Sequence, residues 1–286
     1  MAINTNLKPG PIGVFDSGYG GLTILSEIKE LMPQYDYIYL GDNARAPYGN
    51  KSYDLICDFT LQAVKWFFSQ GCQLVIIACN TASAKALRRL QQQYLPTIDS
   101  HKRLLGVIRP TSIAVASLSK NGHVAVLGTE ATIKSKLYEE EINNLHPHLK
   151  LTSEACPMWV PLVENLEYDK PGADYFVKQH LTKILEKDNK IDTIILGCTH
   201  YPLLLKKIKQ YIPDNITVIS QGKYIAESLK DYMNRHPEMD SICSKNGKRL
   251  YYTTDSAEKF KDIASAFLKE TIEVEKIKLG KDDELV

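Results

Sequence analysis

The sequence predicts an α/β fold in which buried parallel strands alternate with helices. Two observations lead to this prediction. Short apolar runs, most of them rich in β-branched residues, recur along the chain, as is typical of buried parallel strands. Segments with helical spacing separate these runs, which favours α/β units with right-handed crossovers. The expected strands are 12–15 (IGVF), 37–40 (YIYL), 74–78 (LVIIA), 104–108 (LLGVI), 124–127 (VAVL) and 193–196 (TIIL), and the expected helices are 22–31, 53–69, 81–94, 132–145 and 173–187.

Length and composition favour a globular protein that acts on a small molecule. The 286 residues suffice for one large domain or two of about 140 residues each. The chain has 44% apolar residues, 24% charged residues and a net charge of +1. Such a balance gives no positive electrostatic potential that would attract nucleic acid, so no nucleic-acid partner is expected. Its six cysteines include no CxxC pair, so we expect reduced thiols rather than disulfides.

The N-terminal sequence has no basic segment followed by an apolar run and a small-residue cleavage site. No apolar stretch of 18 residues occurs anywhere in the chain. We therefore expect a soluble, cytoplasmic protein with no membrane partner.

A long internal repeat indicates two related halves. The segments GPIGVFDSGYGGLTILSEI (10–28) and LVIIACNTASAKAL (74–87) resemble GHVAVLGTEATIKSKLYEEEI (122–142) and DTIILGCTHYPLLLKKI (192–208). In each pair a strand ends in a small polar turn, and about 60 to 70 residues later another strand ends at a cysteine. We expect the boundary between the two halves near 106–112, because Pro110 disfavours helix in the residue before it.

Two cysteines, Cys79 and Cys198, occupy the matching positions of the repeat, each between an apolar strand and an expected helix start. Thr81 suits a helix cap, and Pro202 suits a first helical turn. Helix N-termini favour thiolate over thiol and bind carboxylates, so we expect thiols with lowered pKa values. Such thiols can serve as both acid and base near neutral pH.

Several kinds of chemistry use cysteine, and the residues alone leave them open. A zinc site lacks a ligand set with recognisable spacing, so no metal ligand is assigned. A single cysteine nucleophile with His200 as its base leaves the second cysteine unexplained, and redox pairs usually lie within one turn. Two opposed thiols fit inversion of a stereocentre, because one removes a proton from one face and the other returns one to the opposite face.

Other polar residues follow the strands. In DSGYGGL (16–22), Asp16 could accept or orient a proton and Ser17 could hold a carboxylate, whereas the glycine spacing fits neither a Walker loop nor a dinucleotide fingerprint. Thr129 is expected to cap a helix. A solvent-facing position explains Glu164 equally well, and Cys156 is expected to be structural. His200 is well placed to exchange protons with Cys198.

Seven motifs, in order, resemble the glutamate racemase family of the aspartate/glutamate racemase superfamily: VFDSGYGGL, GDNARAPYG, ACNTASA, GVIRP, LGTEATIKS, CPMWVPLVE and LGCTHYPLL. The resemblance extends from about residue 12 to about residue 268. It implies two pseudo-symmetric parallel-sheet domains facing across a cleft. It also implies an amino-acid racemase that interconverts L- and D-glutamate without a cofactor and supplies D-glutamate for peptidoglycan synthesis.

The resemblance also implies roles for individual residues. Cys79 would remove the proton from D-glutamate, assisted by Asp16, and Cys198 would remove it from L-glutamate, assisted by His200 and Glu164. The implied substrate contacts are Asp16, Ser17, Tyr48, Gly49, Asn80, Thr81, Thr199 and His200.

Size balance and the resemblance together suggest a first domain of residues 1–108 plus 221–286, a second domain of 109–220, and a homodimer. Arg109 and Thr111 depart from the common family pattern, as do MW at 158–159 and Asn165, but these residues lie off the catalytic pairs. The alternatives are an aspartate racemase or another cysteine-dependent isomerase of the superfamily, and a binding module that does not exchange the α-hydrogen.

Overall fold

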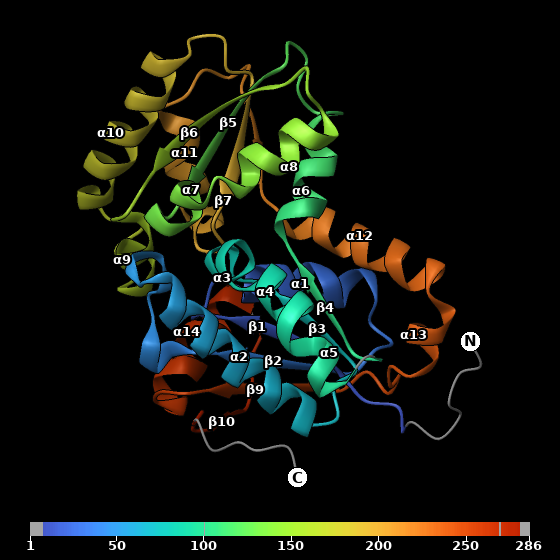
Figure 1. Ribbon diagram of the computed structural model, residues 1–286. Coiled ribbons are helices and arrows are strands. Elements are labelled where there is room, and N and C mark those ends of the chain that lie inside the picture. Colours follow the sequence, from blue (N-terminus) through green and yellow to red (C-terminus); the bar gives the residue numbers. More distant parts are fainter. Residues whose placement is uncertain (1–7, 100, 269, 281–286) are drawn as a thin grey trace.

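The computed structural model describes residues 8–99, 101–268 and 270–280. Within these residues the chain forms two separate parallel sheets, one of six strands and one of four. Figure 1 shows the smaller sheet with its helices above the larger one. We call the six-stranded sheet with its helices the first unit, and the four-stranded sheet with its helices the second unit.

The first unit is built from both ends of the described chain. Its N-terminal elements are β1 (Ile12–Asp16), α1 (Leu22–Leu31), β2 (Tyr37–Gly41), η1 (Asn43–Arg45), η2 (Tyr48–Asn50), α2 (Tyr53–Ser69), β3 (Leu74–Ile77), α3 (Asn80–Lys85), α4 (Leu87–Arg89), η3 (Leu90–Tyr94), α5 (Leu95–Ile98) and β4 (Arg103–Gly106). Its C-terminal elements are α12 (Gly222–Arg235), α13 (Pro237–Ser241), β9 (Arg249–Thr253), α14 (Ala257–Leu268) and β10 (Val274–Lys276).

The second unit lies between these two stretches in the sequence. Its elements are α6 (Ile108–Val115), β5 (His123–Gly128), α7 (Glu130–Ser135), α8 (Leu137–Leu145), β6 (Lys150–Ala155), α9 (Trp159–Glu164), α10 (Pro171–Lys187), β7 (Thr193–Gly197), η4 (Tyr201–Leu204), α11 (Leu205–Gln210) and β8 (Thr217–Ile219).

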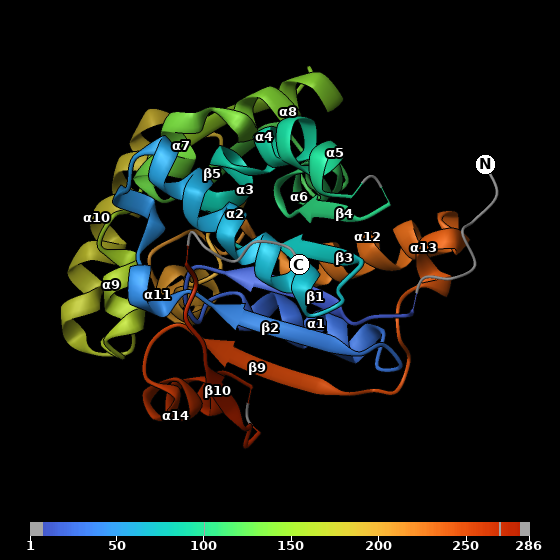
Figure 2. The ribbon, with the colours of Figure 1, turned by 60° about the horizontal axis from the view of Figure 1, so that its bottom comes forward.

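The strand orders confirm the two related halves. The smaller sheet has the order β6-β5-β7-β8, and the larger sheet contains the corresponding order β2-β1-β3-β4 with β9 and β10 added beyond β2. Figure 2 shows β9, β2, β1 and β3 side by side in this order. In both sheets the first and third strands are neighbours, which makes the crevice at their carboxyl ends the expected ligand site of such a fold.

Helices cover both faces of the larger sheet, which explains why its central strands are continuous apolar runs. In β1, Ile12 and Val14 belong to the core on the side of α1 and α12, whereas Phe15 packs into the core on the side of α2. All five residues of β1 are buried. The α/β class with parallel sheets is thus confirmed.

The six predicted strands are all present, but four further strands were missed and three helix expectations need correction. The expected helix 81–94 is instead a short α3, α4 and a π-helical turn η3. The expected helix 132–145 is split at Lys136, whose φ of 59° is left-handed. Thr81 does not cap α3, because the side chain of Cys79 takes that position. The predicted cap at Thr129 is confirmed.

The chain crosses between the units twice. The first crossing lies between β4 and α6, and the second between β8 and α12, whose residues Ile225, Leu229 and Met233 pack in the core beside α1. The domain limits at 108 and 220 remain a prediction. Among the described residues, no helix is both long and apolar enough to cross a membrane.

Candidate active site

Both cysteines of the repeat lie in one cavity between the two units. The volume open to the centre of a water molecule in this cavity is about 10 Å³. Nine of the eleven predicted site residues line it: Ser17, Tyr48, Gly49, Cys79, Asn80, Thr81, Cys198, Thr199 and His200. The other two, Asp16 and Glu164, lie behind this lining and contact it through hydrogen bonds to Thr199 and His200.

Cys79 follows strand β3 and is the N-cap of α3. The backbone N–H of Ala82 donates to its Sγ over 3.5 Å, and the thiol donates to Ser17 Oγ over 3.4 Å. Burial, and next the charge of Asp16, raise the pKa of the Cys79 thiol to about 12. The expected lowering of this pKa is therefore wrong, because removal from water outweighs the donors at the helix start.

Cys198 follows strand β7, but an α-helix does not begin immediately after it. The 3₁₀ helix η4 comes first, with Pro202 in its first turn, and α11 starts only at Leu205. The neighbour that distinguishes this thiol is His200, whose Nδ1 lies 3.8 Å from Cys198 Sγ. The two cysteines thus match in topology but differ in their immediate partners.

His200 connects Cys198 to a carboxylate. Its Nε2 lies 3.2 Å from Glu164 Oε1, at the end of α9. Burial alone would lower the pKa of His200, but hydrogen bonds and charges from Cys198 and Glu164 outweigh it and raise that pKa well above 6.5. Glu164 is therefore a partner of His200 rather than a solvent-facing residue, and the imidazole holds its proton to higher pH than a free histidine.

Asp16 links the two halves of the site. It is fully buried at the end of β1, where its Oδ2 accepts from the N–H of Gly18 over 2.9 Å and its Oδ1 accepts from Thr199 Oγ1 over 3.2 Å. Burial raises the pKa of Asp16, although the nearby charge of His200 acts in the opposite direction. The Asp16 to Thr199 bond joins the first unit to the second.

Hydroxyl groups from both units also meet beside the cavity. Thr81 Oγ1 lies 2.9 Å from Thr129 Oγ1 and 3.3 Å from Thr132 Oγ1. Tyr48 is buried and donates to Asp42, while the side-chain amide of Asn80, another lining residue, bonds to Gln221 and Tyr138.

Sequence reasoning missed three lining residues, Pro47, Thr129 and Val160. Thr129 could have been found, because it follows the first strand of the second unit as Ser17 follows that of the first. Pro47 and Val160 carry no polar signal. Among the described residues, no group of three or more His, Cys, Asp or Glu side chains is placed to hold one metal ion.

Comparisons with known proteins find similar sequences. A family model for Asp/Glu/Hydantoin racemase matches residues 21–229. The chain is 40% identical over 273 residues to a glutamate racemase from Staphylococcus carnosus (strain TM300), covering 94% of this chain and 98% of that protein.

Solved structures show the same fold. A glutamate racemase isoform from Bacillus anthracis has a TM-score of 0.86 and 36% identity, covering 94% of this chain and 98% of that one. A glutamate racemase from Francisella tularensis in complex with D-glutamate has a TM-score of 0.83 and 31% identity, covering 95% of this chain and 98% of that one.

Proposed function

The chain belongs to the Asp/Glu/Hydantoin racemase family, and from this premise we propose that it interconverts L-glutamate and D-glutamate with two cysteine thiols and no cofactor. The observation that carries the proposal is the pair Cys79 and Cys198, which come from matching places in two related units and line one cavity. An inversion needs an acid and a base on opposite faces of one carbon, and thiols can take both roles.

The proposed reaction moves two protons. One thiolate takes the α-proton of glutamate, so that the Cα–H bond breaks and its electron pair stays on carbon. The opposite thiol then gives its proton to the other face of that carbon. Hydroxyl and backbone N–H groups around the cavity would hold the α-carboxylate and stabilise the charge that develops, since preorganised donors in a site closed to water are effective.

The proposed roles follow the two sides of the site. Cys79 takes the proton from D-glutamate with Asp16 assisting, and Cys198 takes it from L-glutamate with His200 and Glu164 assisting. In the closed structure the raised pKa of Cys79 keeps its thiol protonated. This protonation state suits delivery of a proton by Cys79, which is the step that completes conversion of L- to D-glutamate. The proposed substrate contacts are Ser17, Tyr48, Gly49, Asn80, Thr81, Thr199 and His200, with Asp16.

Substrate entry requires the two units to separate. A cavity of about 10 Å³ has room for about one water molecule, which is far less than glutamate needs. The bonds that Asp16 and Thr81 make across the two units would break when the units separate and reform when they close.

Closure should be sensitive to Gly20, which lies where the units touch. A Cβ at this position would lie 2.4 Å from Thr199 Oγ1 and 2.6 Å from His200 Nδ1. We expect Gly20→Ala to lower turnover about 100-fold, because misplacement by about 1 Å can have that cost. Circular dichroism of glutamate at saturating concentration measures this loss.

The matched control for Gly20→Ala is Gly172→Ala on α10, where an added Cβ meets nothing within 4 Å. Gly172→Ala should keep wild-type turnover and should not lower the melting temperature, because alanine suits an exposed helical position; Gly20→Ala should still fold. Normal turnover of Gly20→Ala would contradict the close contact that we describe.

The proposed function itself is tested with purified protein, D-glutamate and no added cofactor. We expect the circular dichroism of D-glutamate to decay to zero, and that of L-glutamate to do the same from the opposite sign. D-aspartate is the comparison substrate. Racemisation of aspartate but not glutamate would select the alternative isomerase, and binding of glutamate without racemisation would select the binding module.

We further propose that the protein acts in the cytoplasm as a homodimer and supplies D-glutamate for peptidoglycan synthesis. The support for these finer points is the resemblance to glutamate racemases. Depletion of the protein in its host should make growth depend on added D-glutamate, and light scattering should give twice the chain mass of 32.3 kDa. Growth of depleted cells without added D-glutamate would exclude the role in peptidoglycan synthesis. A monomer mass would exclude the homodimer.

A further inference from the structure

Four buried polar side chains form a hydrogen-bonded group between the two units, and we call this group the amide ring: Asn80, Thr111, Tyr138 and Gln221. Each of the four is at most 3% exposed. Asn80 Nδ2 donates to Gln221 Oε1 over 2.6 Å, and Tyr138 Oη donates to Asn80 Oδ1 over 2.8 Å. Gln221 Nε2 donates over 2.8 Å to both Tyr138 Oη and Thr111 Oγ1.

The amide ring lies at both crossings of the chain. Thr111 is on α6, just after the first crossing, and Gln221 directly precedes α12 at the second. Tyr138 is on α8 of the second unit, whereas Asn80 is the first residue of α3 in the first unit. A fully satisfied buried network of this kind rigidifies its surroundings, because each polar group would be costly to leave unpaired.

Asn80 is bonded directly to Cys79 in the chain, and Cys79 caps the helix that Asn80 begins. A shift of Asn80 therefore moves Cys79 Sγ as well. Cys198 is held differently, by His200 and by the bond from its neighbour Thr199 to Asp16. The amide ring is thus linked to the position of the Cys79 thiol and not to that of Cys198.

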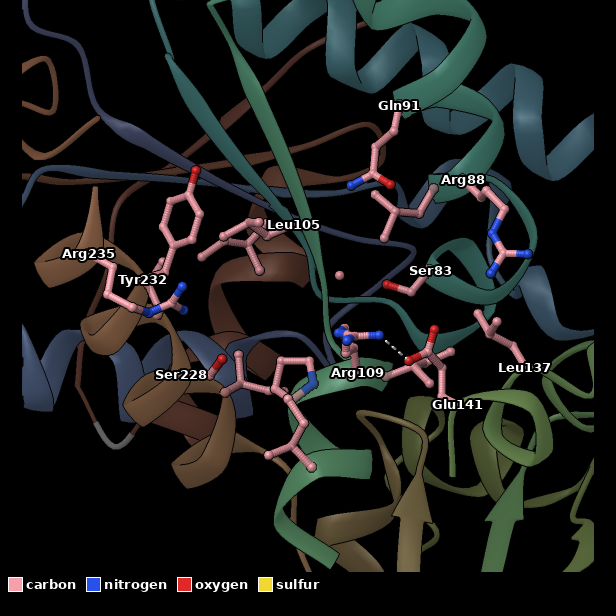
Figure 3. A pocket seen from close by; sticks show the side chains of 18 residues that line it. Ser83, Arg88, Gln91, Leu105, Arg109, Leu137, Glu141, Ser228, Tyr232 and Arg235 are labelled. Carbon is pink, nitrogen blue, oxygen red and sulfur yellow. Dashed lines mark hydrogen bonds and ion pairs between the residues drawn. The ribbon is translucent and has the colours of Figure 1, made fainter. Parts of the chain in front are cut away.

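A second cavity lies beside the two crossings of the chain. We call this side of the molecule the hinge side and the cavity the hinge cavity. It has a volume of about 280 Å³ and is lined by residues of both units, including α12 of the first unit. Figure 3 shows side chains around this space, with the ion pair between Arg109 and Glu141 (2.9 Å) at its edge. Leu137 and Pro110, next in sequence to Tyr138 and Thr111, line it.

The amide ring consequently lies between the hinge cavity and the active-site cavity, which Asn80 lines. The cavity makes packing between the units less complete on the hinge side, where Ala84 of α3 and Tyr224 of α12 still pack against the core of the second unit. At this point the hydrogen bonds of Gln221, together with the bond from Tyr138 to Asn80, join α3 to α6 and α8.

We propose that Gln221 is a positioning residue for proton transfer at Cys79: through Asn80 it sets where the Cys79 thiol stands when the units close. The inference rests on the proposed two-thiol reaction and goes beyond it, since Gln221 touches neither thiol. Loss of the Gln221 amide removes three of the four bonds of the amide ring and leaves Asn80 with only its bond to Tyr138. The active-site cavity of the closed structure is small, so it leaves little room for a displacement of Asn80 and Cys79.

The test is Gln221→Ala, assayed with glutamate carrying deuterium on the α-carbon. Starting from D-glutamate, Cys79 breaks the labelled bond; starting from L-glutamate, Cys198 breaks it and Cys79 only delivers a proton. A displaced Cys79 makes its own step more rate-limiting. We therefore expect the isotope effect on kcat/KM to rise from D-glutamate and to fall from L-glutamate, with kcat lowered about 100-fold and KM changed much less.

A merely destabilised variant would not give this pattern, because fewer folded molecules leave both isotope effects unchanged. Tyr138→Phe breaks the amide ring at another point and should shift both effects in the same directions by less; it also serves if Gln221→Ala does not fold. Gln91→Ala is the matched control. Gln91 lines the hinge cavity and donates to Leu104 O over 2.8 Å within the first unit, so its loss should leave both effects unchanged.

Unchanged isotope effects in both Gln221→Ala and Tyr138→Phe would overturn the inference, provided that the wild-type protein racemises glutamate. Failure of the wild-type protein to racemise glutamate would instead overturn the proposed function. The two failures are therefore distinguishable within one set of measurements.

Discussion

Cys79→Ser and Cys198→Ser are each expected to lose racemisation of glutamate, with kcat reduced about 10³-fold or more in both directions. A positioned acid or base contributes roughly 10²–10⁴-fold to a rate, and a serine hydroxyl ionises far less readily than a thiol. Inversion needs both proton transfers, so either substitution blocks both directions. Circular dichroism started from each pure enantiomer measures the loss.

The thiol variants should still bind glutamate, because we assign the carboxylate contacts to hydroxyl and N–H groups. Cys57→Ser is the matched control. Cys57 is buried in the first unit and its Sγ donates to Lys85 O over 3.5 Å, a bond that serine can also make. Cys57→Ser should keep wild-type turnover. Near-normal turnover of either Cys79→Ser or Cys198→Ser would exclude the two-thiol reaction.

The second large effect concerns the proton on His200. We expect His200→Asn to lower kcat about 100-fold, because asparagine cannot exchange a proton with Cys198. In the wild-type protein, Cys198 and Glu164 raise the pKa of His200, so the protonated imidazole persists to higher pH than in a free histidine. A rate that depends on this proton falls only on the alkaline side, as pH passes the raised pKa.

Glu164→Gln isolates the cause of that shift. Removing the carboxylate removes one of the two groups that raise the pKa of His200, so the alkaline fall in activity should begin at lower pH. His200→Asn should lose this limb altogether. The measurement is kcat against pH for the wild type and both variants, starting from L-glutamate. An alkaline limb that stays in place in Glu164→Gln would contradict the assigned pairing.

The elements best predicted from the sequence are the strands that are buried on both faces of a sheet. All six predicted strands are present, since central strands of parallel sheets are continuous apolar runs. The missed strands β6, β8 and β10 are sheet edges, and β9 is next to an edge. In β6 the sequence KLTSEA contains one large apolar residue, Leu151, and only Glu154 is buried, so it gives no apolar run. Residues 275–286 have no periodic apolar face, which predicts a loosely held tail, yet Val274–Lys276 pairs with β9; residues 281–286 lie outside the described part.

Most of the predicted site residues also come together, because they follow strands whose carboxyl ends face each other. The sequence does not show how opposing effects on the pKa of a side chain balance. Cys79 does cap a helix, as a thiolate site would, yet complete burial beside Asp16 raises its pKa instead. Gln221 was missed because its role depends on partners 83, 110 and 141 residues away. Only the folded crossings bring these partners together.

The central claim is that two different thiols act on opposite faces of one carbon, and the position of deuterium tests it most directly. The wild-type protein is incubated briefly with D-glutamate in D₂O, the enantiomers are separated, and mass spectrometry measures α-deuterium in each; L-glutamate is then treated in the same way. We predict deuterium in the product enantiomer and protium in the remaining substrate, in both directions. Deuterium appearing equally in remaining substrate and product, or product that retains the substrate's own α-proton, would contradict the two-thiol account.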